Sequence, residues 1–202
     1  MEERLFRKYL DNCNQREEVL DIPCGTGRLL PTLKKLDFIS IYAADYSSEM
    51  LLVCKSNSSF TSIKFSEEDI YNTSFNDQRF MVLLSSRFIF HCDDQERLFT
   101  EFNRLIKADG YLIFDTLRWS PRTWTSLFSS RLGGNIYTNS DISILTLANN
   151  HGFTIVDSES ILILPSFIYK FLPKLLITLL DKLESIWPSN LKTKKIWILK
   201  KK

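Results

Sequence analysis

Two glycines and two acids near the start of the chain are spaced as in a ligand-binding turn. The stretch VLDIPCGTGRLL, residues 19–30, places Asp21 just before a turn that contains Gly25 and Gly27. A second apolar run, FISIYAAD, ends in Asp45. Glycines let a backbone approach a ligand closely, and a carboxylate can accept hydrogen bonds from two ribose hydroxyls. The pattern therefore predicts a nucleotide-binding or nucleoside-binding site.

Alternating strands and helices are needed to bring these residues to one edge of a sheet. Apolar runs predict strands at 19–22, 38–45, 63–69, 79–86, 111–117, 153–164 and 194–202. Helical spacing predicts helices at 28–36, 47–56, 93–110 and 140–153, the third of them ended by Asp109-Gly110. This order predicts an α/β fold with a doubly wound, seven-stranded, mostly parallel sheet and a helical insertion before the last strand. Ligands of such sheets bind at the carboxyl ends of the strands.

Two nucleotide-binding patterns compete for the first turn. A dinucleotide-binding turn has G-x-G-x-x-G, but the third position here is Leu30, and that interpretation leaves Asp21 unexplained. The arrangement D-x-x-C-G-T-G instead resembles the first motif of class I S-adenosylmethionine-dependent methyltransferases, usually V-L-D-x-G-C-G-T-G. IYAADYSSEML, SEEDIYNTSF and FMVLLSSRFIFH…FNRLIKADGYLIF resemble the later motifs, so the resemblance extends from about residue 19 to 117. It implies the Rossmann-like methyltransferase fold, with S-adenosyl-L-methionine as cofactor.

The resemblance also implies which residues hold that cofactor. Asp45 would accept hydrogen bonds from both ribose hydroxyls, Asp69 would meet the adenine amine, and one of two serines after the fourth strand would lie beside the sulfonium. The full set is Asp21, Pro23, Cys24, Gly25, Thr26, Gly27, Asp45, Tyr46, Met50, Asp69, Ile70, Ser85 and Ser86. Several alternatives stay open: Asp45 as a strand-end cap, Glu67 or Glu68 in place of Asp69, and Tyr46 and Met50 as packing residues.

Pro23 departs from the family pattern, which has a glycine at this position. Proline fixes φ near −65° and removes one N–H donor. We therefore expect residue 23 to have a negative φ and no N–H contact with ligand, and the donors to come from Cys24 to Gly27. A second departure, Ala108-Asp109-Gly110 in place of Pro-Gly-Gly, lies on the far side of the predicted sheet.

Few residues suit chemistry on the methyl acceptor. His91 follows the fourth strand and is the candidate general base, with a surface or helix-start histidine as the alternative. Arg87 is the candidate contact for an acidic substrate group, with a structural salt bridge as the alternative. Asp115 and Trp119 follow the fifth strand and would also face the pocket in one interpretation. The two histidines are far apart and the four cysteines lack C-x-x-C spacing, so no metal is expected.

The acceptor class follows from what stands after the fourth strand. Nucleobase and glutamine N-methyltransferases of the family usually carry an N-P-P-Y-like tetrapeptide there, whereas this chain has Ser-Ser-Arg-Phe. We therefore expect an enzyme that methylates a small, hydrophobic organic acceptor, in the manner of quinone-pathway or natural-product O- and C-methyltransferases. A protein or nucleic-acid methyltransferase, or a non-catalytic cofactor-binding partner subunit, is the alternative.

The length of the chain limits the number of domains it can form, and its net charge limits the class of partner. The chain has 202 residues, 44% of them hydrophobic, and a formal net charge of +2. This size predicts a single methyltransferase domain over 1–202, with an N-terminal helix in 1–18, the cofactor-binding core in 19–117 and the substrate-side half in 118–202. The small net charge gives no signature of polyanion binding, so we expect no nucleic-acid partner.

A wide apolar helical face lies in SFIYKFLPKLLITLLDKLESIW, residues 166–187. Three interpretations compete: a lid over the pocket, a dimer or partner face, and an interfacial membrane helix that presents lipid-like substrates. Free thiols without a disulfide framework and an N-terminus without an apolar core predict a cytoplasmic protein. The third interpretation would make it peripheral to the membrane; no run of 18 apolar residues predicts a membrane span.

Overall fold

A seven-stranded sheet forms the centre of the computed structural model, which describes residues 2–13, 16–119, 136–162, 172–184 and 186–202. The strands are β1 (Glu18–Asp21), β2 (Ser40–Asp45), β3 (Lys64–Glu67), β4 (Phe80–Ser85), β5 (Ile106–Leu117), β6 (Phe153–Ile161) and β7 (Lys194–Lys201). They lie in the order β3-β2-β1-β4-β5-β7-β6. Strands β1 to β5 pair in parallel, and β7 is antiparallel to both β5 and β6. The predicted seven-stranded, mostly parallel α/β sheet is confirmed.

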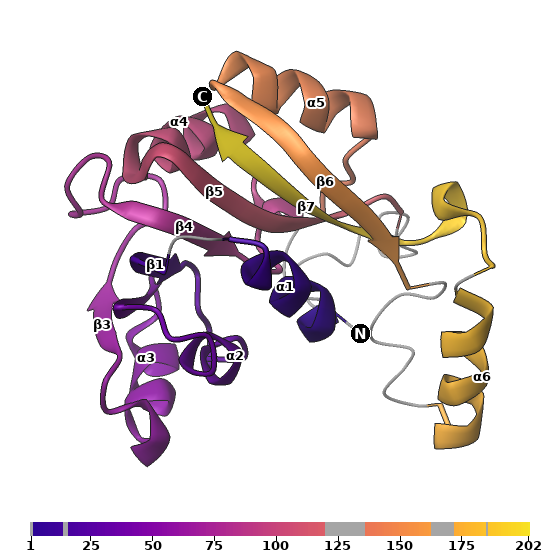
Figure 1. Cartoon of the computed structure of the whole chain (residues 1–202), viewed down its shortest axis with the longest axis horizontal. Helices are drawn as coiled ribbons and strands as arrows, with labels where there is room; N and C mark the ends of the chain where they lie inside the picture. Colours follow the sequence, from indigo (N-terminus) through magenta and orange to yellow (C-terminus); the bar gives the residue numbers. More distant parts are fainter. Residues whose placement is uncertain (1, 14–15, 120–135, 163–171, 185) are drawn as a thin grey trace.

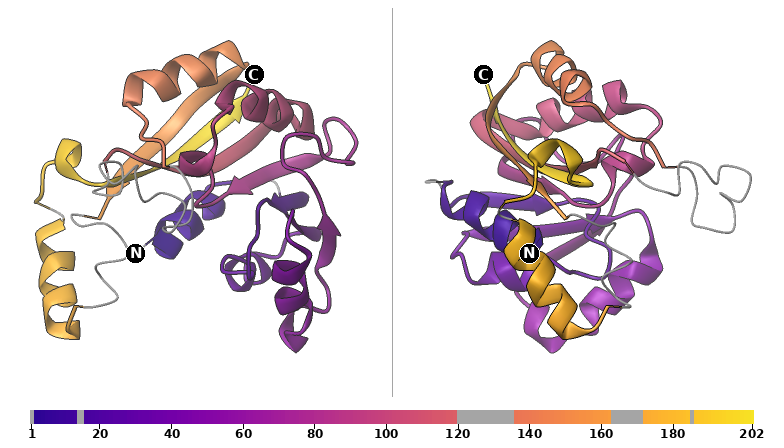
Figure 2. Two further views of the ribbon diagram at one scale, coloured as in Figure 1. Left: turned by 180° about the vertical axis from the view of Figure 1, so that it is seen from behind. Right: turned by 90° about the vertical axis from the view of Figure 1, so that its right-hand side faces the viewer.

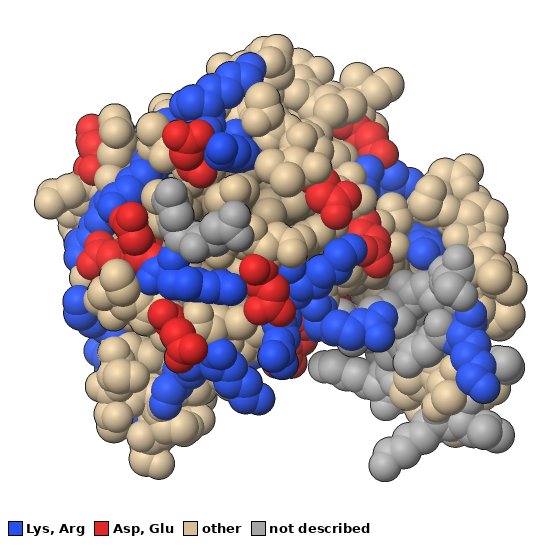
Figure 3. Space-filling view, viewed as in Figure 1, with Lys and Arg blue, Asp and Glu red and all other residues tan. Residues whose placement is uncertain are grey.

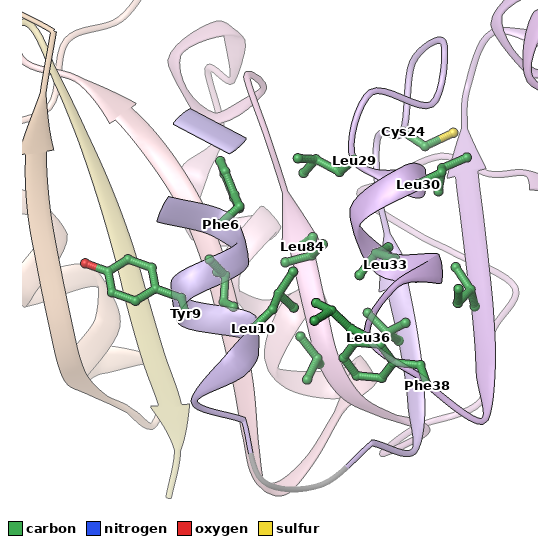
Figure 4. Close-up of a cluster of buried hydrophobic side chains, with 14 of the residues drawn as sticks. Phe6, Tyr9, Leu10, Cys24, Leu29, Leu30, Leu33, Leu36, Phe38 and Leu84 are labelled. Carbon is green, nitrogen blue, oxygen red and sulfur yellow. The ribbon is translucent and has the colours of Figure 1, made fainter. Parts of the chain in front are cut away.

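Helices cover both faces of this sheet (Figures 1 and 2). The described helices are α1 (Glu2–Asp11), α2 (Leu30–Lys34), α3 (Ser48–Lys55), α4 (Gln95–Leu105), α5 (Asp141–Asn150) and α6 (Lys174–Glu184), with 3₁₀ turns η1 (Ser58–Phe60), η2 (Ile89–His91) and η6 (Ser189–Leu191). Helices α1 to α5 are the ones that cover the sheet. Alternate strand residues enter two separate apolar clusters. One cluster packs α1, α2 and α3 against the sheet, with Phe6, Leu10, Leu33 and Leu84 among its members (Figure 4). The other packs α4 and α5 against the opposite face.

The boundary between α4 and β5 differs from the sequence prediction. The helix predicted over 93–110 ends at Leu105, and Ile106 already pairs with Phe80 of β4. The predicted stop at Asp109-Gly110 therefore lies within β5, where Asp109 has a φ of +63°. A Cβ at Gly110 would lie 2.9 Å from the Met81 carbonyl oxygen, so glycine permits the close approach of β5 to β4 at this irregular register.

The insertion before the last strand contains α6, which Figure 1 draws away from the sheet. Its described side chains are half-buried or exposed, and Leu176 is 44% exposed. Residues 166–171 of the predicted lid lie outside the described residues. Within the described part of the chain, no helix has the length and apolar character needed to cross a membrane.

Candidate functional site

Two cavities meet at the turn that follows β1, at the carboxyl ends of the parallel strands. The first, named here the apolar cavity, has a volume of about 560 Å³. Apolar and aromatic side chains from four strand ends form most of its wall. Its lining residues are Ile22, Pro23, Gly25, Asp45, Tyr46, Ser47, Met50, Glu68, Asp69, Ile70, Tyr71 and Phe88.

The second cavity, named here the ionic cavity, is smaller, at about 270 Å³. Two acids and two arginines stand among its lining residues, which are Asp21, Pro23, Cys24, Gly25, Thr26, Arg28, Leu29, Asp45, Ser86 and Arg87. Pro23, Gly25 and Asp45 line both cavities. One ligand extending past Gly25 would therefore contact both.

Left-handed backbone conformations in this turn fall on the glycines. Gly25 has a φ of +56° and Gly27 a φ of +82°, whereas Pro23 lies outside the positive-φ region, as expected. A Cβ added to Gly25 would meet nothing within 4 Å, so the backbone there faces open space. A Cβ on Gly27 would lie 2.9 Å from Leu30 Cδ1 and 3.1 Å from Cys54 Sγ, so Gly27 serves packing and lines neither cavity.

The turn uses three of its own donors to hold itself in place. The Cys24 N–H donates to the Ala44 carbonyl at 2.8 Å, and the Gly25 N–H donates to Asp45 Oδ2 at 2.7 Å. The Gly27 N–H donates to the Cys24 carbonyl at 3.0 Å. These three donors, which we expected at the ligand, are occupied within the protein. The Thr26 N–H, by contrast, makes no hydrogen bond with the described residues and belongs to a residue that lines the ionic cavity.

Asp45 joins the two cavities at the end of β2. Its Oδ1 accepts the Ser47 N–H at 3.0 Å while its Oδ2 accepts the Gly25 N–H. A carboxylate has about four lone-pair positions, so each oxygen can accept a further hydrogen bond. Ser47 in turn caps α3 by accepting the Met50 N–H, as the sequence predicts. Asp45 is thus both a strand-end cap and a cavity residue.

The register at the end of β3 can be decided from the contacts of its acids. Both Glu68 carboxylate oxygens bind Ser74, one at its N–H and one at its hydroxyl. Asp69 Oδ1 accepts only the neighbouring Tyr71 N–H, and Ile70 lies beside it in the wall of the apolar cavity. Both Glu68 oxygens are engaged by Ser74, whereas Asp69 Oδ2 makes no hydrogen bond with the described residues, so Asp69 has the greater acceptor capacity for a ligand.

Asp21 and Arg28 place opposite charges in the wall of the ionic cavity. Burial raises the pKa of Asp21 to about 7, and the Arg28 guanidinium opposes that shift. Arg28 Nη2 donates to the Ser86 hydroxyl, which fixes the guanidinium across the cavity. A carboxylate and a guanidinium in one small cavity complement a ligand that carries an ammonium group and a carboxylate group.

A buried ion-pair network, defined here as Glu2, Arg28, Arg87, Asp115 and Lys194, backs this cavity. Glu2 Oε1 accepts from Lys194 Nζ at 2.7 Å, and Glu2 Oε2 accepts from Arg87 Nη2 at 2.7 Å. Arg28 Nη1 lies 3.5 Å from Glu2 Oε2, and Lys194 also pairs with Asp115. Burial opposes ionisation of Glu2, but Lys194 and Arg87 outweigh it and lower its pKa to about 2.

Arg87 has an unusual backbone within this network. Its φ is +62°, a conformation that costs a non-glycine residue of the order of 1–3 kcal/mol. The Asp115 carboxylate accepts its N–H at 2.6 Å, and Glu2 holds its guanidinium. The predicted alternative, a structural salt bridge, is therefore present, although Arg87 also lines the ionic cavity.

The structure gathers most of the predicted site and leaves three residues outside. Ser85 is fully buried behind the cavities, and its hydroxyl has no hydrogen-bond partner among the described residues. His91 lies exposed on η2 against Phe90 and lines neither cavity, so the geometry gives the predicted base no support. Gly27 is the third. Asp115 is fully buried and Trp119 is 41% exposed, and neither lines the two cavities.

Several residues of the site were not predicted. Arg28 directly follows the glycine turn, and that position is the only signal that pointed to it. Glu2 and Lys194 carry no such signal, because they lie 192 positions apart in the sequence and meet only in the fold. No group of three histidine, cysteine, aspartate or glutamate residues suited to a metal occurs among the residues described.

Comparisons with known proteins find similarity to methyltransferases. Residues 20–114 match the family model of a methyltransferase domain. The chain is 27% identical over 128 residues to a mitochondrial ubiquinone biosynthesis O-methyltransferase of Dictyostelium discoideum. This alignment covers 57% of this chain and 39% of that protein. The chain thus spans less than half the length of the curated relatives it matches.

Solved structures share the fold over nearly the whole chain. An S-adenosylmethionine-dependent methyltransferase from Mesorhizobium loti has a TM-score of 0.71 at 15% identity, over 96% of both chains. Geranyl diphosphate C-methyltransferase from Streptomyces coelicolor has a TM-score of 0.75 at 13% identity, over 99% of this chain and 81% of that one. The family match over residues 20–114, the ordered motifs and the sheet order show that this chain has the fold of the class I S-adenosylmethionine-dependent methyltransferases and is similar to them over its first half.

Proposed function

We propose that this chain transfers a methyl group from S-adenosylmethionine to a small, hydrophobic organic acceptor. The observation that carries the proposal is the pair of cavities joined at Gly25 and Asp45. The apolar cavity suits an adenine ring, with Ile70 and Met50 at its wall and Asp69 as acceptor for the amine. Asp45 suits the ribose, and the ionic cavity suits the methionine part, its ammonium at Asp21 and its carboxylate at Arg28.

The open space at Gly25 supports the fit of this cofactor. The backbone there faces a gap that a Cβ would enter without contact, as a turn lying against a ligand requires. When bound, S-adenosylmethionine supplies an electrophilic methyl group on a sulfonium. The part of this chain is alignment and exclusion of water, which can contribute several kcal/mol through proximity.

A small acceptor is favoured over a nucleic acid by the charge pattern and by the relatives. Lysines and arginines lie beside aspartates and glutamates on the face shown in Figure 3. The ion pairs Arg79–Glu18 and Lys107–Glu17 are examples of such neighbours in the structure. The relatives named above act, by their names, in ubiquinone biosynthesis and on geranyl diphosphate. Three roles remain proposals for 166–187: a lid, a partner face or a membrane-surface helix. None of its described residues lines either cavity.

Calorimetric titration tests the cofactor assignment. The protein should bind S-adenosylmethionine and S-adenosylhomocysteine and should not bind a nicotinamide dinucleotide. Release of S-adenosylhomocysteine in the presence of a panel of quinols, phenols and isoprenoid compounds would then support the acceptor class. Binding of the dinucleotide alone would overturn the proposal, and turnover only with a protein or nucleic acid would replace the acceptor.

A further inference from the structure

The ion-pair network has a geometry that structural stability alone does not require. Arg87 is held at both ends, its N–H by Asp115 and its guanidinium by Glu2, in a backbone conformation that is unfavourable for a non-glycine residue. Strained residues persist where the surrounding contacts over-determine them, and they cluster at ligand sites. Three distant segments of the chain thus combine to hold one side chain in a cavity wall.

The charges of the network do not balance. Arg28, Arg87 and Lys194 face only two carboxylates within it, those of Glu2 and Asp115. Lys194, Glu2 and Asp115 are buried, whereas 49% of the Arg87 side chain is exposed. The surplus positive charge of the network therefore lies at the wall of the ionic cavity. Asp21 and Asp45 line the same cavity. Under the proposed function Asp21 meets the ammonium group of the cofactor, and two backbone N–H groups bind the Asp45 carboxylate.

Arg87 lines the ionic cavity together with Arg28, in the cavity to which the proposed function assigns the methionine part of the cofactor. It follows Ser86 at the end of β4, and the next residue, Phe88, lines the apolar cavity. Under the proposed function, Arg28 already meets the one carboxylate of the cofactor. Arg87 is then the arginine left for a second anion, and a guanidinium binds carboxylates and phosphates through paired hydrogen bonds.

We propose that Arg87 is a specificity-determining residue that binds a carboxylate or phosphate group of the methyl acceptor, and that Glu2, which accepts from its guanidinium and is itself paired with Lys194, positions it. This inference rests on the proposed function. The acceptor is then an organic molecule with an anionic group beside its hydrophobic part. Glu2 acts through Arg87 and makes no contact with ligand in this assignment.

Simple anions test the site before the acceptor is known. Malonate and inorganic phosphate are titrated into protein saturated with S-adenosylhomocysteine, with uncharged malonamide as the matched probe. We expect the two anions to bind and malonamide not to bind. Arg87→Gln should weaken anion binding about tenfold or more, and Arg87→Lys, which keeps the charge but not the paired geometry, should weaken it less.

A second comparison separates the acceptor from the cofactor as the source of the anion. S-adenosylhomocysteine carries the amino-acid carboxylate, whereas 5′-methylthioadenosine does not. If Arg87 serves the acceptor, Arg87→Gln should leave the affinity for both unchanged. Weaker binding of S-adenosylhomocysteine alone would assign Arg87 to the cofactor and overturn the inference.

Glu2 supplies a variant that keeps Arg87 itself intact. Glu2→Gln should weaken anion binding several-fold and should weaken binding of S-adenosylhomocysteine less, because Glu2 accepts from Arg87 at 2.7 Å but lies 3.5 Å from Arg28. Glu3→Gln is the matched control, because Glu3 lies on the same helix, contacts Thr32 and lines neither cavity. Equal anion binding by wild type and Arg87→Gln would overturn the inference. No binding of S-adenosylhomocysteine by the wild type would instead mean that the proposed function fails.

Discussion

The apolar cavity and the ionic cavity share one turn but are assembled in different ways. Short segments at the ends of successive strands form the apolar cavity, each from a motif that can be recognised in the sequence. The wall of the ionic cavity is held by a network that joins α1, β5 and β7 to the turn. The difference indicates that local motifs define the apolar cavity, whereas the fold as a whole defines the ionic cavity.

Asp45 belongs to both cavities, and its removal should have the largest effect. Asp45→Ala should weaken binding of S-adenosylhomocysteine at least about hundredfold, or about 3 kcal/mol, because hydrogen bonds to a charged group are lost together with the anchor of the Gly25 turn. Calorimetric titration measures the change. Glu49→Ala is the control, since Glu49 is an exposed acid in the first turn of α3, the helix that follows Asp45, and lines neither cavity. Unchanged affinity in Asp45→Ala would remove the point that joins the two cavities.

Substitutions of the two glycines of the turn should affect different quantities: the free energy of unfolding at Gly27 and the ligand affinity at Gly25. Gly27→Ala should lower the free energy of unfolding by about 2–4 kcal/mol, because the new Cβ meets Leu30, Cys54 and Phe60 in a left-handed conformation. Gly25→Ala meets no neighbour, so it should cost only about 1 kcal/mol of backbone strain and act mainly on ligand affinity. Urea unfolding with and without S-adenosylhomocysteine measures both. Equal loss of stability in the two variants would contradict the assignment of Gly25 to the ligand.

The same contrast explains what the sequence could predict. The turn at Gly25, the acid at Asp45 and the order of the strands follow from spacing and apolar runs, which are local properties. The predicted end of α4 is wrong because Ile106 continues the apolar stripe of the helix in the sequence, whereas in the structure it pairs with Phe80 of β4 as part of β5. Glu2 could not be placed, because its partners Arg87 and Lys194 become neighbours only after β4, β5 and β7 have assembled.

Asp21 should make stability fall as pH rises. Its pKa of about 7 in the folded protein exceeds the ordinary value of 3.8, so the folded state binds more protons than the unfolded state between these values. The stabilising contribution is complete below pH 3.8 and is lost as pH rises through 7. Relative to Asp21→Asn, the wild type should lose about 2 kcal/mol between about pH 5.5 and 8, measured by urea unfolding.

Ligand binding should show the opposite dependence on pH if Asp21 meets an ammonium group. Binding then requires the carboxylate, so the affinity for S-adenosylhomocysteine should rise up to about tenfold per pH unit below 7 and level off above about 8. Asp21→Asn should flatten this profile. Affinity for 5′-methylthioadenosine, which has no ammonium, should not follow pH. A parallel profile for both ligands would place the titrating group outside the ionic cavity.

The smallest effects give the sharpest test of the division between the two cavities. Ile70→Ala removes apolar wall from the apolar cavity alone and should weaken S-adenosylhomocysteine and 5′-methylthioadenosine equally, by about fivefold, or 1 kcal/mol. Arg28→Gln should weaken only S-adenosylhomocysteine, by about tenfold, because the second ligand has no carboxylate to lose. Calorimetric titration of both ligands into both variants measures four affinities. If Arg28→Gln weakens both ligands alike, Arg28 acts through the shape of the turn, and the ionic cavity does not recognise the amino-acid part as a separate group.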